Sequence, residues 1–307
     1  MKKILVIGDI IADSYRECAF KKMCPDAPSV KAVVEMNNDL RPGGAANVAV
    51  NIASLTENVA ISLIGEIDVP TARSVKQLSK NKVNLSYCDM TGEVLLKERI
   101  LIHGQMAIRV DNKSLVSPFA SESIENSLKC YLANNNPDLV VVSDYAAGSI
   151  NDASLEILLS MRERLLVDTK MTDLSIFADG GKKTKLIKLN LDEWKNVIKT
   201  EASPERFFSS MILTKGDRGA ELVTREDHDG WSITRQLVVQ PHSVQAVDVC
   251  GCGDTFMAGL ASSLLVNDDY FTALQFANAA AATVVSKPRT AVADLDLTLK
   301  LLGRDAV

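Results

Sequence analysis

A short glycine-containing turn, Asp248-Val249-Cys250-Gly251-Cys252-Gly253-Asp254, precedes a predicted helix that continues through Leu260. Small residues expose backbone N–H groups, and the first amides and positive dipole end of a helix both favour an anion. A carboxylate beside such an anion hole repels phosphate, so Asp254 does not fit simple phosphate binding. It fits a base that takes a proton from a hydroxyl attacking a phosphoryl group held by the turn. The turn therefore predicts a kinase centre.

The same turn also has a purely structural interpretation. Glycine turns often precede helices, and Asp is a favoured helix N-cap. The turn alone does not decide between the two interpretations, so partner residues elsewhere in the chain have to be found.

The composition is that of an ordinary soluble protein. The chain has 307 residues, 47% of them hydrophobic, which suffices for one large α/β domain or two smaller ones. Its formal net charge of -5 gives no basic field for nucleic acid. No stretch stays apolar for the roughly 18 residues of a membrane span, and the start of the chain is interpreted as a buried strand rather than a signal peptide. We expect a cytoplasmic protein without nucleic-acid or membrane partners.

The six cysteines are Cys18, Cys24, Cys88, Cys130, Cys250 and Cys252. They form no CxxC pair and have no histidine partners at metal-ligand spacing. Free thiols in a reducing compartment are expected. Cys250 and Cys252 are interpreted as small residues lining the turn rather than as a structural zinc site.

From residue 59 onward, strand and helix patterns alternate. The predicted strands are 59–65, 139–143, 165–168, 185–189 and 211–214, and the predicted helices include 70–82, 118–134, 151–162, 271–286 and 295–302. Repeated βα units favour a mostly parallel sheet covered by helices on both faces. The fold class is therefore α/β.

Two pairs of strands do not belong to this alternation, at about 14–38 before it and at about 94–111 within it. Their apolar and polar residues alternate, as in strands with one solvated face. Antiparallel strands inserted between βα units predict a small sheet that forms a lid over a ligand. The exposed faces also make these strands candidates for contacts between the subunits of a homodimer.

An early group of residues has the chemistry of a sugar site. Asp13 follows the first strand, at the sheet edge where α/β proteins collect ligands. Gly43 and Gly44 open an alanine-rich helix and let a ligand approach the backbone, while Asn47 donates and accepts hydrogen bonds, as sugar hydroxyls require. A loop cap and a tight turn before a closely packed helix are the structural alternatives.

Polar residues recur at the ends of the later strands, namely Asp144, Lys170, Asn190, Glu193 and Thr214. Each alone is compatible with a helix cap or a turn, and their recurrence at one sheet edge favours a site. Asn190 and Glu193 lie one turn apart at a helix start, which suits them to order a hydrated Mg²⁺ beside phosphates.

A nucleotide has two predicted contact regions. Thr214 to Gly219, with Gly216 inside it, is a turn between strands where a nucleotide can lie against exposed backbone. Asn278 stands among alanines that leave room for a flat base, or that simply let two helices pack closely. The chain has no Walker A pattern, so another device has to hold the phosphates.

Three motifs, Gly43-Gly44-x-x-Asn47, Asn190-x-x-Glu193 and Asp248-x-x-Gly251-x-Gly253-Asp254, resemble those of the ribokinase-like (PfkB) carbohydrate kinases in order and spacing. The resemblance implies one ribokinase-like domain over residues 1–307, a three-layer sandwich with a mostly parallel central sheet and a small β-sheet lid. Local matches are most similar to the heptose 7-phosphate kinases; they include Gly8-Asp9-x-x-x-Asp13-x-Tyr15, Arg41-Pro42-Gly43-Gly44 and Ser143-Asp144-Tyr145-Ala146-Ala147-Gly148. Bifunctional relatives carry a further domain where this chain ends, so a stand-alone kinase is expected.

The resemblance implies MgATP-dependent phosphorylation of the anomeric hydroxyl of D-glycero-D-manno-heptose 7-phosphate. Asp254 would be the base, with an anion hole formed by the amides of Gly251, Cys252 and Gly253. The implied sugar-binding residues are Asp13, Gly43, Gly44, Asn47, Arg99, Asp144 and Lys170. The implied ATP-binding residues are Asn190, Glu193, Thr214, Gly216, Gly219 and Asn278, with Glu193 at the metal. For the sugar's own phosphate, the candidate cations are Lys22, Lys97, Arg99, Arg109 and Lys170.

The chain departs from the family pattern near these sites. Cys250 and Cys252 replace the usual Thr and Ala, Ser14 stands where Arg is usual, and Lys287-Pro288-Arg289 lacks the expected glycine; Thr169, Met171 and Leu189 are further departures. Two other functions therefore stay open. One is a kinase for a different sugar or a nucleoside, and the other is a catalytically weakened, ligand-binding relative.

Overall fold

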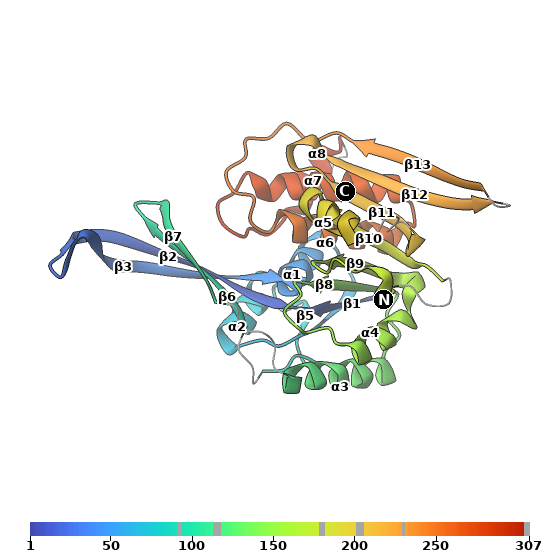
Figure 1. Cartoon of the computed structure of the whole chain (residues 1–307), viewed down its shortest axis with the longest axis horizontal. Helices are drawn as coiled ribbons and strands as arrows, with labels where there is room; N and C mark the ends of the chain where they lie inside the picture. Colours follow the sequence, from blue (N-terminus) through green and yellow to red (C-terminus); the bar gives the residue numbers. More distant parts are fainter. Residues whose placement is uncertain (91–93, 113–117, 178–181, 201–205, 229–230, 304–307) are drawn as a thin grey trace.

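The computed structural model describes residues 1–90, 94–112, 118–177, 182–200, 206–228 and 231–303. Within these residues the central sheet has the strand order β13-β12-β11-β10-β9-β8-β1-β4-β5 (Figure 1). The strands are β1 (Lys2–Gly8), β4 (Val59–Ile64), β5 (Val83–Asn84), β8 (Leu139–Asp144), β9 (Leu165–Thr169), β10 (Thr184–Asn190), β11 (Phe208–Thr214), β12 (Ala220–His228) and β13 (Trp231–Val239). Neighbours from β11 to β5 are parallel, and β12 and β13 add antiparallel strands at one edge. The predicted mostly parallel sheet is confirmed.

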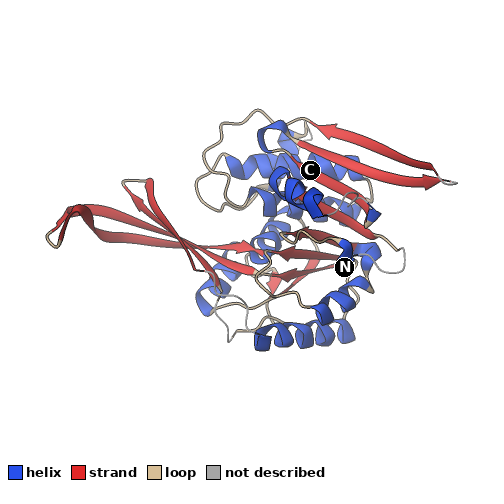
Figure 2. Ribbon diagram, in the orientation of Figure 1, coloured by secondary structure: helices blue, strands red, loops and turns tan. Residues whose placement is uncertain are grey.

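Helices cover both faces of this sheet (Figure 2). One face carries α1 (Ala45–Leu55), α2 (Val69–Leu78), α6 (Cys252–Val266), α7 (Tyr270–Val285) and α8 (Leu295–Leu301), and the other carries α3 (Pro118–Asn134), α4 (Asp152–Leu159) and α5 (Leu191–Thr200). Strand β1 shows how the sequence produces the two layers. Ile4 and Val6 belong to one core, Leu5 and Ile7 to the other, because side chains alternate across a strand. The three-layer α/β architecture is confirmed.

A second sheet projects from the main body, in the order β3-β2-β6-β7 (Figure 1). Its strands are β2 (Ile10–Cys24), β3 (Ala27–Gly44), β6 (Leu95–Ile102) and β7 (Gln105–Asn112). Each hairpin is antiparallel, as predicted, but β2 and β6 pair in parallel. The strand patterns alone do not indicate this parallel pairing, which arises because the chain returns to the main body between β3 and β6.

The base of the small sheet is continuous with the core. Only Asp9 separates β1 from β2, and β3 runs into α1 without a loop. Gly8 has a φ of 144°, and a Cβ on it would lie 2.0 Å from the Ser143 carbonyl oxygen. Because only glycine permits this close approach, β1 and β8 stay side by side where β2 begins. The small sheet therefore starts at the edge where the strand-end polar residues gather.

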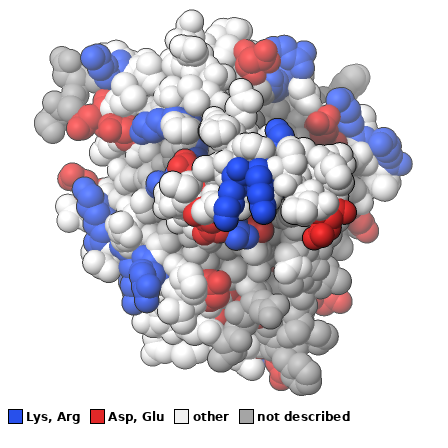
Figure 3. All heavy atoms as spheres, turned by 90° about the vertical axis from the view of Figure 1, so that its left-hand side faces the viewer, with Lys and Arg blue, Asp and Glu red and all other residues white. Residues whose placement is uncertain are grey.

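On the face from which the small sheet projects, basic and acidic residues are interspersed (Figure 3). An anionic ligand therefore depends on a local arrangement of donors rather than on a wide field of one sign. No helix in the described part of the chain is long and apolar enough to cross a membrane.

Gly259 allows α6 and α7 to pack closely, because a Cβ there would lie 2.7 Å from the Ala277 Cα. We expect Gly259→Ala to lower the free energy of unfolding by about 1–3 kcal/mol, since the backbone of α7 has to move. Urea denaturation measures this change. Ser263→Ala, at a half-buried position of the same helix, is the control and is expected to change stability by about 0.5 kcal/mol or less. Equal stabilities of the two variants would contradict the close packing.

Candidate active site

The turn before α6 is held by its glycine and by hydrogen bonds within the turn. Gly251 is the N-cap of α6 with a φ of 76°, and a Cβ on it would lie 2.7 Å from the Asn47 Nδ2. The turn therefore needs glycine both for its left-handed backbone and for its contact with α1. The Cys250 amide donates to Asp248 Oδ1 at 2.9 Å, and the Cys252 amide donates to the Val249 carbonyl at 3.3 Å. One of the three predicted anion-hole amides thus already has a partner within the turn.

Asp254 lies in the first turn of α6 and is only 4% exposed. Its Oδ2 accepts from Asn47 Nδ2, and its Oδ1 accepts from the Tyr145 hydroxyl, both at 2.9 Å. Burial raises the pKa of Asp254 to about 6, with a further increase from the negative charge of Asp168, although both hydrogen bonds act in the opposite direction. A carboxylate with such a pKa is ionised at neutral pH and is more basic than an ordinary aspartate.

The orientation of Asn47 follows from its neighbours. Asn51 Nδ2 donates to Asn47 Oδ1 at 2.8 Å, so the amide nitrogen of Asn47 faces Asp254. Asn51 is fixed in turn by the Ala293 amide, which donates to its Oδ1 at 2.8 Å. Helix α1 therefore presents the Asn47 amide as a donor to Asp254. The segment before α8 holds Asn51, and through it Asn47, in place.

Four of the predicted sugar-binding residues lie together at the base of the small sheet, namely Asp13, Gly43, Gly44 and Arg99. Asp13 accepts from Arg99 at 2.6 Å and from Thr290 Oγ1 at 3.1 Å. A Cβ on Gly43 would lie 2.6 Å from Asp13 Oδ2, and one on Gly44 would lie 2.4 Å from the Asp9 carbonyl. Both glycines thus permit close backbone approach at this base. Arg99 is itself 7% exposed, and its charge is compensated by Asp13.

Asp144, also predicted to bind the sugar, does not line the main cleft. It is buried, with Oδ2 accepting from the Thr169 hydroxyl and Oδ1 from the Ala146 amide. Burial raises its pKa to about 6. Next to it, Asp9 accepts from the amides of Tyr145, Ala147 and Ser149. These two carboxylates fix the loop after β8 by hydrogen bonds to its amides, and this loop places the Tyr145 hydroxyl next to Asp254.

The remaining predicted residues line one cleft of about 670 Å³ together with the turn. They are Lys170, Asn190, Glu193, Thr214, Gly216, Gly219, Asn278, Gly251, Cys252, Gly253 and Asp254. Asn190 and Glu193 cap α5 reciprocally, since Asn190 Oδ1 accepts the Glu193 amide at 3.0 Å and Glu193 Oε2 accepts the Asn190 amide at 2.7 Å. Glu193 also forms an ion pair with Lys170. The structure thus brings the turn before α6 and the Asn190-x-x-Glu193 motif together in a single cleft.

Lys188 was not among the predicted site residues. It is 3% exposed, lines the cleft and forms an ion pair with the buried Asp168 on the neighbouring strand. Its Nζ lies 3.4 Å from the position of a Cβ on Gly253. A positive charge therefore faces the anion-hole turn. The available signal was a lysine inside the apolar run Leu186-Ile187-Lys188-Leu189, which is unusual for a strand buried on both faces.

The six cysteines are free thiols. Burial raises the pKa of Cys252 to about 12, and burial also raises the pKa of Cys250. Both thiols are therefore protonated at neutral pH, which makes them poor nucleophiles and poor metal ligands. Beside Asp254 they act as small, neutral side chains.

Solved structures of similar shape give the class of fold. Phosphofructokinase-2 of Escherichia coli, solved with potassium, matches with a TM-score of 0.72 at 17% identity over 98% of both chains. Ribokinase of Thermotoga maritima matches with a TM-score of 0.71 at 16% identity, over 99% of this chain and 100% of that chain. The molecule has the ribokinase fold that the sequence predicted.

Sequence relatives give the family. The family model described as pfkB family carbohydrate kinase matches residues 1–296, and the chain belongs to this family of ATP-dependent sugar kinases. Bifunctional protein HldE of Psychromonas ingrahamii is 32% identical over 295 residues, and that of Histophilus somni is 32% identical over 314 residues. These matches cover 93% and 98% of this chain, but the chain spans only 60% and 64% of those relatives.

We expect Asp254→Asn to lower kcat by about 10²–10⁴-fold while ATP still binds, because the variant keeps the shape of the turn but has no base. For the unsubstituted protein, kcat/KM should fall as pH drops through about 6, since protonation removes the base. Steady-state kinetics from pH 5 to 8 and ATP titration calorimetry measure these effects.

Asp268→Asn is the matched control, because this carboxylate has a side chain 69% exposed and lies outside the cleft. It should keep both turnover and the pH profile. Normal turnover in Asp254→Asn, or a profile flat through pH 6, would exclude Asp254 as the base.

Proposed function

We propose that this kinase transfers the γ-phosphoryl group of ATP to the anomeric hydroxyl of D-glycero-D-manno-heptose 7-phosphate, giving the 1,7-bisphosphate. The observation that carries phosphoryl transfer is the buried Asp254 at the start of α6, held by Asn47 and Tyr145 at 2.9 Å each. The choice of acceptor is supported by the motifs resembling heptose 7-phosphate kinases and by 32% identity to the HldE proteins.

In the proposed mechanism Asp254 accepts the proton of the attacking hydroxyl. The Asn47 and Tyr145 hydrogen bonds hold the carboxylate in one orientation, so the base needs no rearrangement during transfer. The amides of Gly251 and Gly253 and the Lys188 ammonium would face the transferred group and stabilise its negative charge. Asp13, Gly43, Gly44 and Asn47 would contact the sugar.

The cleft has a donor set that fits Mg²⁺. Glu193 and Asp168 supply carboxylates, and the buried Asp168 Oδ1 has no hydrogen-bond partner in the described part of the chain. No group of three or more His, Cys, Asp and Glu side chains in the described residues forms a metal cage. This agrees with Mg²⁺, which usually keeps several waters and takes phosphate oxygens beside one or two carboxylates. Bound there with ATP, Mg²⁺ would neutralise phosphate charge.

The acceptor's own phosphate needs a cation away from the cleft with Asp168 and Glu193. Of the five predicted cations, Arg99, Arg109 and Lys170 have carboxylate partners, and Lys22 is exposed on the distal half of β2. Lys97 stands at the base of the small sheet, with its Nζ 4.9 Å from the centre of the Tyr145 ring. We assign the 7-phosphate contact to Lys97, because it lies in register with Asp13 on the small sheet and does not line the main cleft.

A panel of acceptors tests this assignment. We expect kcat/KM for heptose 7-phosphate to exceed that for the unphosphorylated heptose, ribose, fructose 6-phosphate and nucleosides by at least about 10²-fold. Lys97→Met should raise KM for heptose 7-phosphate by about 10–100-fold, because a charge-assisted hydrogen bond is lost, and should leave the unphosphorylated heptose unaffected.

Preference for an unphosphorylated sugar would favour the alternative of a kinase with another acceptor. Saturable binding of sugar and ATP without product from any acceptor would favour the third interpretation, a ligand-binding relative. That interpretation draws on Cys250 and Cys252, which depart from the family pattern beside Asp254.

We further propose that a second copy of the chain covers the small sheet. Ile108 and Val110 are adjacent positions on one face of β7 and are 52% and 46% exposed. Met36 and Met106, also on this sheet, are 70% and 62% exposed. So much exposed apolar surface favours burial between subunits.

We expect the chain to have the mass of a dimer by light scattering during size-exclusion chromatography. The double variant Ile108→Glu with Val110→Glu should be a monomer, because burying the introduced carboxylates is unfavourable. Lys21→Glu, exposed on the same sheet, should stay a dimer. A monomeric unsubstituted chain would reject this contact.

A further inference from the structure

Arg289 has a backbone conformation that favours glycine. It lies between α7 and α8 with a φ of 67°. This left-handed region is strained for a long side chain, and such strain persists only where surrounding contacts fix the residue. It is also the segment that lacks the glycine expected from the family resemblance. The arginine therefore replaces a more suitable residue, and its contacts indicate why.

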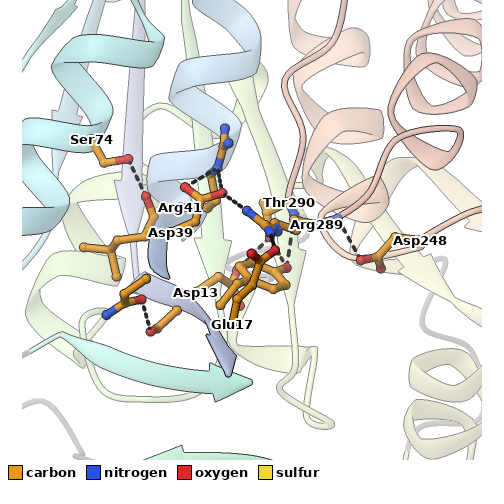
Figure 4. A network of polar contacts seen from close by, with 12 residues as sticks. Asp13, Glu17, Asp39, Arg41, Ser74, Asp248, Arg289 and Thr290 are labelled. Carbon is orange, nitrogen blue, oxygen red and sulfur yellow. Dashed lines mark hydrogen bonds and ion pairs between the residues drawn. The ribbon is translucent and has the colours of Figure 1, made fainter. Parts of the chain in front are cut away.

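The side chain and the backbone of Arg289 contact different parts of the molecule (Figure 4). The guanidinium donates to Asp39 of β3 at 2.6 Å and forms an ion pair with Glu17 of β2. The backbone amide donates to Asp248 Oδ2 at 2.9 Å. Asp39 is shared with Arg41, whose Nε donates to it at 2.9 Å. One residue thus connects both long strands of the small sheet to the turn that precedes α6.

The connection continues into the candidate active site. The other oxygen of Asp248 accepts the Cys250 amide at 2.9 Å, immediately before Gly251. On the sugar side, Thr290 Oγ1 lies 3.1 Å from Asp13 Oδ2, and the Thr290 amide donates to the Tyr15 hydroxyl at 3.0 Å. Consecutive residues, 289 and 290, therefore contact the catalytic turn and the predicted acceptor-binding carboxylate.

We propose that Arg289 is a positioning residue that fixes the small sheet relative to the catalytic turn, and so sets the spacing between Asp13 and Asp254. Asp13 lies on β2, whose distal part projects away from the main body, whereas Asp254 lies on α6 in the core. The Arg289 contacts to Glu17 and Asp39 add to those of Thr290 across this junction, and they limit a movement of the projecting strands that would change the distance between the two carboxylates. Phosphoryl transfer is sensitive to such a change, since a misplacement of about 1 Å can cost on the order of 10²-fold in rate.

Arg289→Gly separates positioning from folding, because glycine suits the φ of 67° while removing the guanidinium. We expect an unchanged or higher Tm. KM for the acceptor should rise about tenfold, with KM for ATP within about twofold of the original, because only the small sheet is released. Hydrogen exchange of the protein without ligands should become faster at the Cys250 amide and in the base of β2 and β3.

Arg16→Ala is the matched control. Arg16 also binds two carboxylates, Glu35 and Glu98, but both lie within the small sheet. This variant should leave acceptor KM and exchange at Cys250 within twofold of the original. An equal effect of Arg16→Ala would mean a general loosening of the small sheet and would overturn the proposal.

Removal of the two carboxylates that bind the Arg289 guanidinium provides a second test. The double variant Glu17→Gln with Asp39→Asn should reproduce the rise in acceptor KM, and adding Arg289→Gly to it should change KM by less than about twofold. Fully additive effects would overturn the proposal, as would unchanged KM and exchange in Arg289→Gly. Only the KM measurements depend on the proposed function, because they need the proposed acceptor. The exchange measurement needs no substrate, so a wrong acceptor and a wrong role for Arg289 give different results.

Discussion

The structure depends on the placement of one buried carboxylate. At 4% exposure, Asp254 has little water to solvate its charge, so the protein has to supply donors. Those donors come from α1 through Asn47 and from the loop after β8 through Tyr145. Three segments distant in the sequence therefore have to assemble before this carboxylate acquires its environment. The incomplete compensation of burial leaves a pKa of about 6, which is the value that a base working near neutral pH requires.

The supporting groups are themselves held by hydrogen bonds. Asn47 has its orientation set by Asn51, which the Ala293 amide holds, and the Tyr145 loop is gathered around Asp9 by three backbone amides. These groups need little reorganisation during a reaction, because their hydrogen-bond donors already point at the Asp254 carboxylate. The side chains of Cys250 and Cys252, which depart from the family pattern, form none of these hydrogen bonds. The hydrogen-bonded environment of Asp254 is therefore compatible with the chain's own departures from the family pattern.

Local patterns in the sequence predicted the fold class and much of the cleft. Repeated βα units gave the parallel sheet, and Asn190 with Glu193 cap α5 as their spacing at a helix start indicates. Features that depend on strand register were not predicted. Lys188 and Asp168 are paired in register on β10 and β9, and the joining of the hairpins depends on the parallel pairing of β2 and β6. Neither a register nor a strand partner can be read from a single sequence, because both are set by contacts between distant segments. The role of Arg289 was missed for the same reason, although the absent glycine marked its position.

Because β1 runs into β2 and β3 runs into α1, the residues near the proposed sugar site and those of the main cleft fall in separate parts of the sequence. Asp13, Asn47, Lys97 and Arg99 all lie in the first 112 residues, whereas every residue lining the main cleft lies at Tyr145 or beyond. Mutation or recombination in the first part alters the surface offered to the acceptor without changing the amino acids that face the phosphates. Residues 289 and 290 belong to the second part but contact Glu17, Asp39 and Asp13 on the small sheet of the first part. A lineage that acquires a new acceptor through its small sheet therefore has to adjust this short segment at the same time.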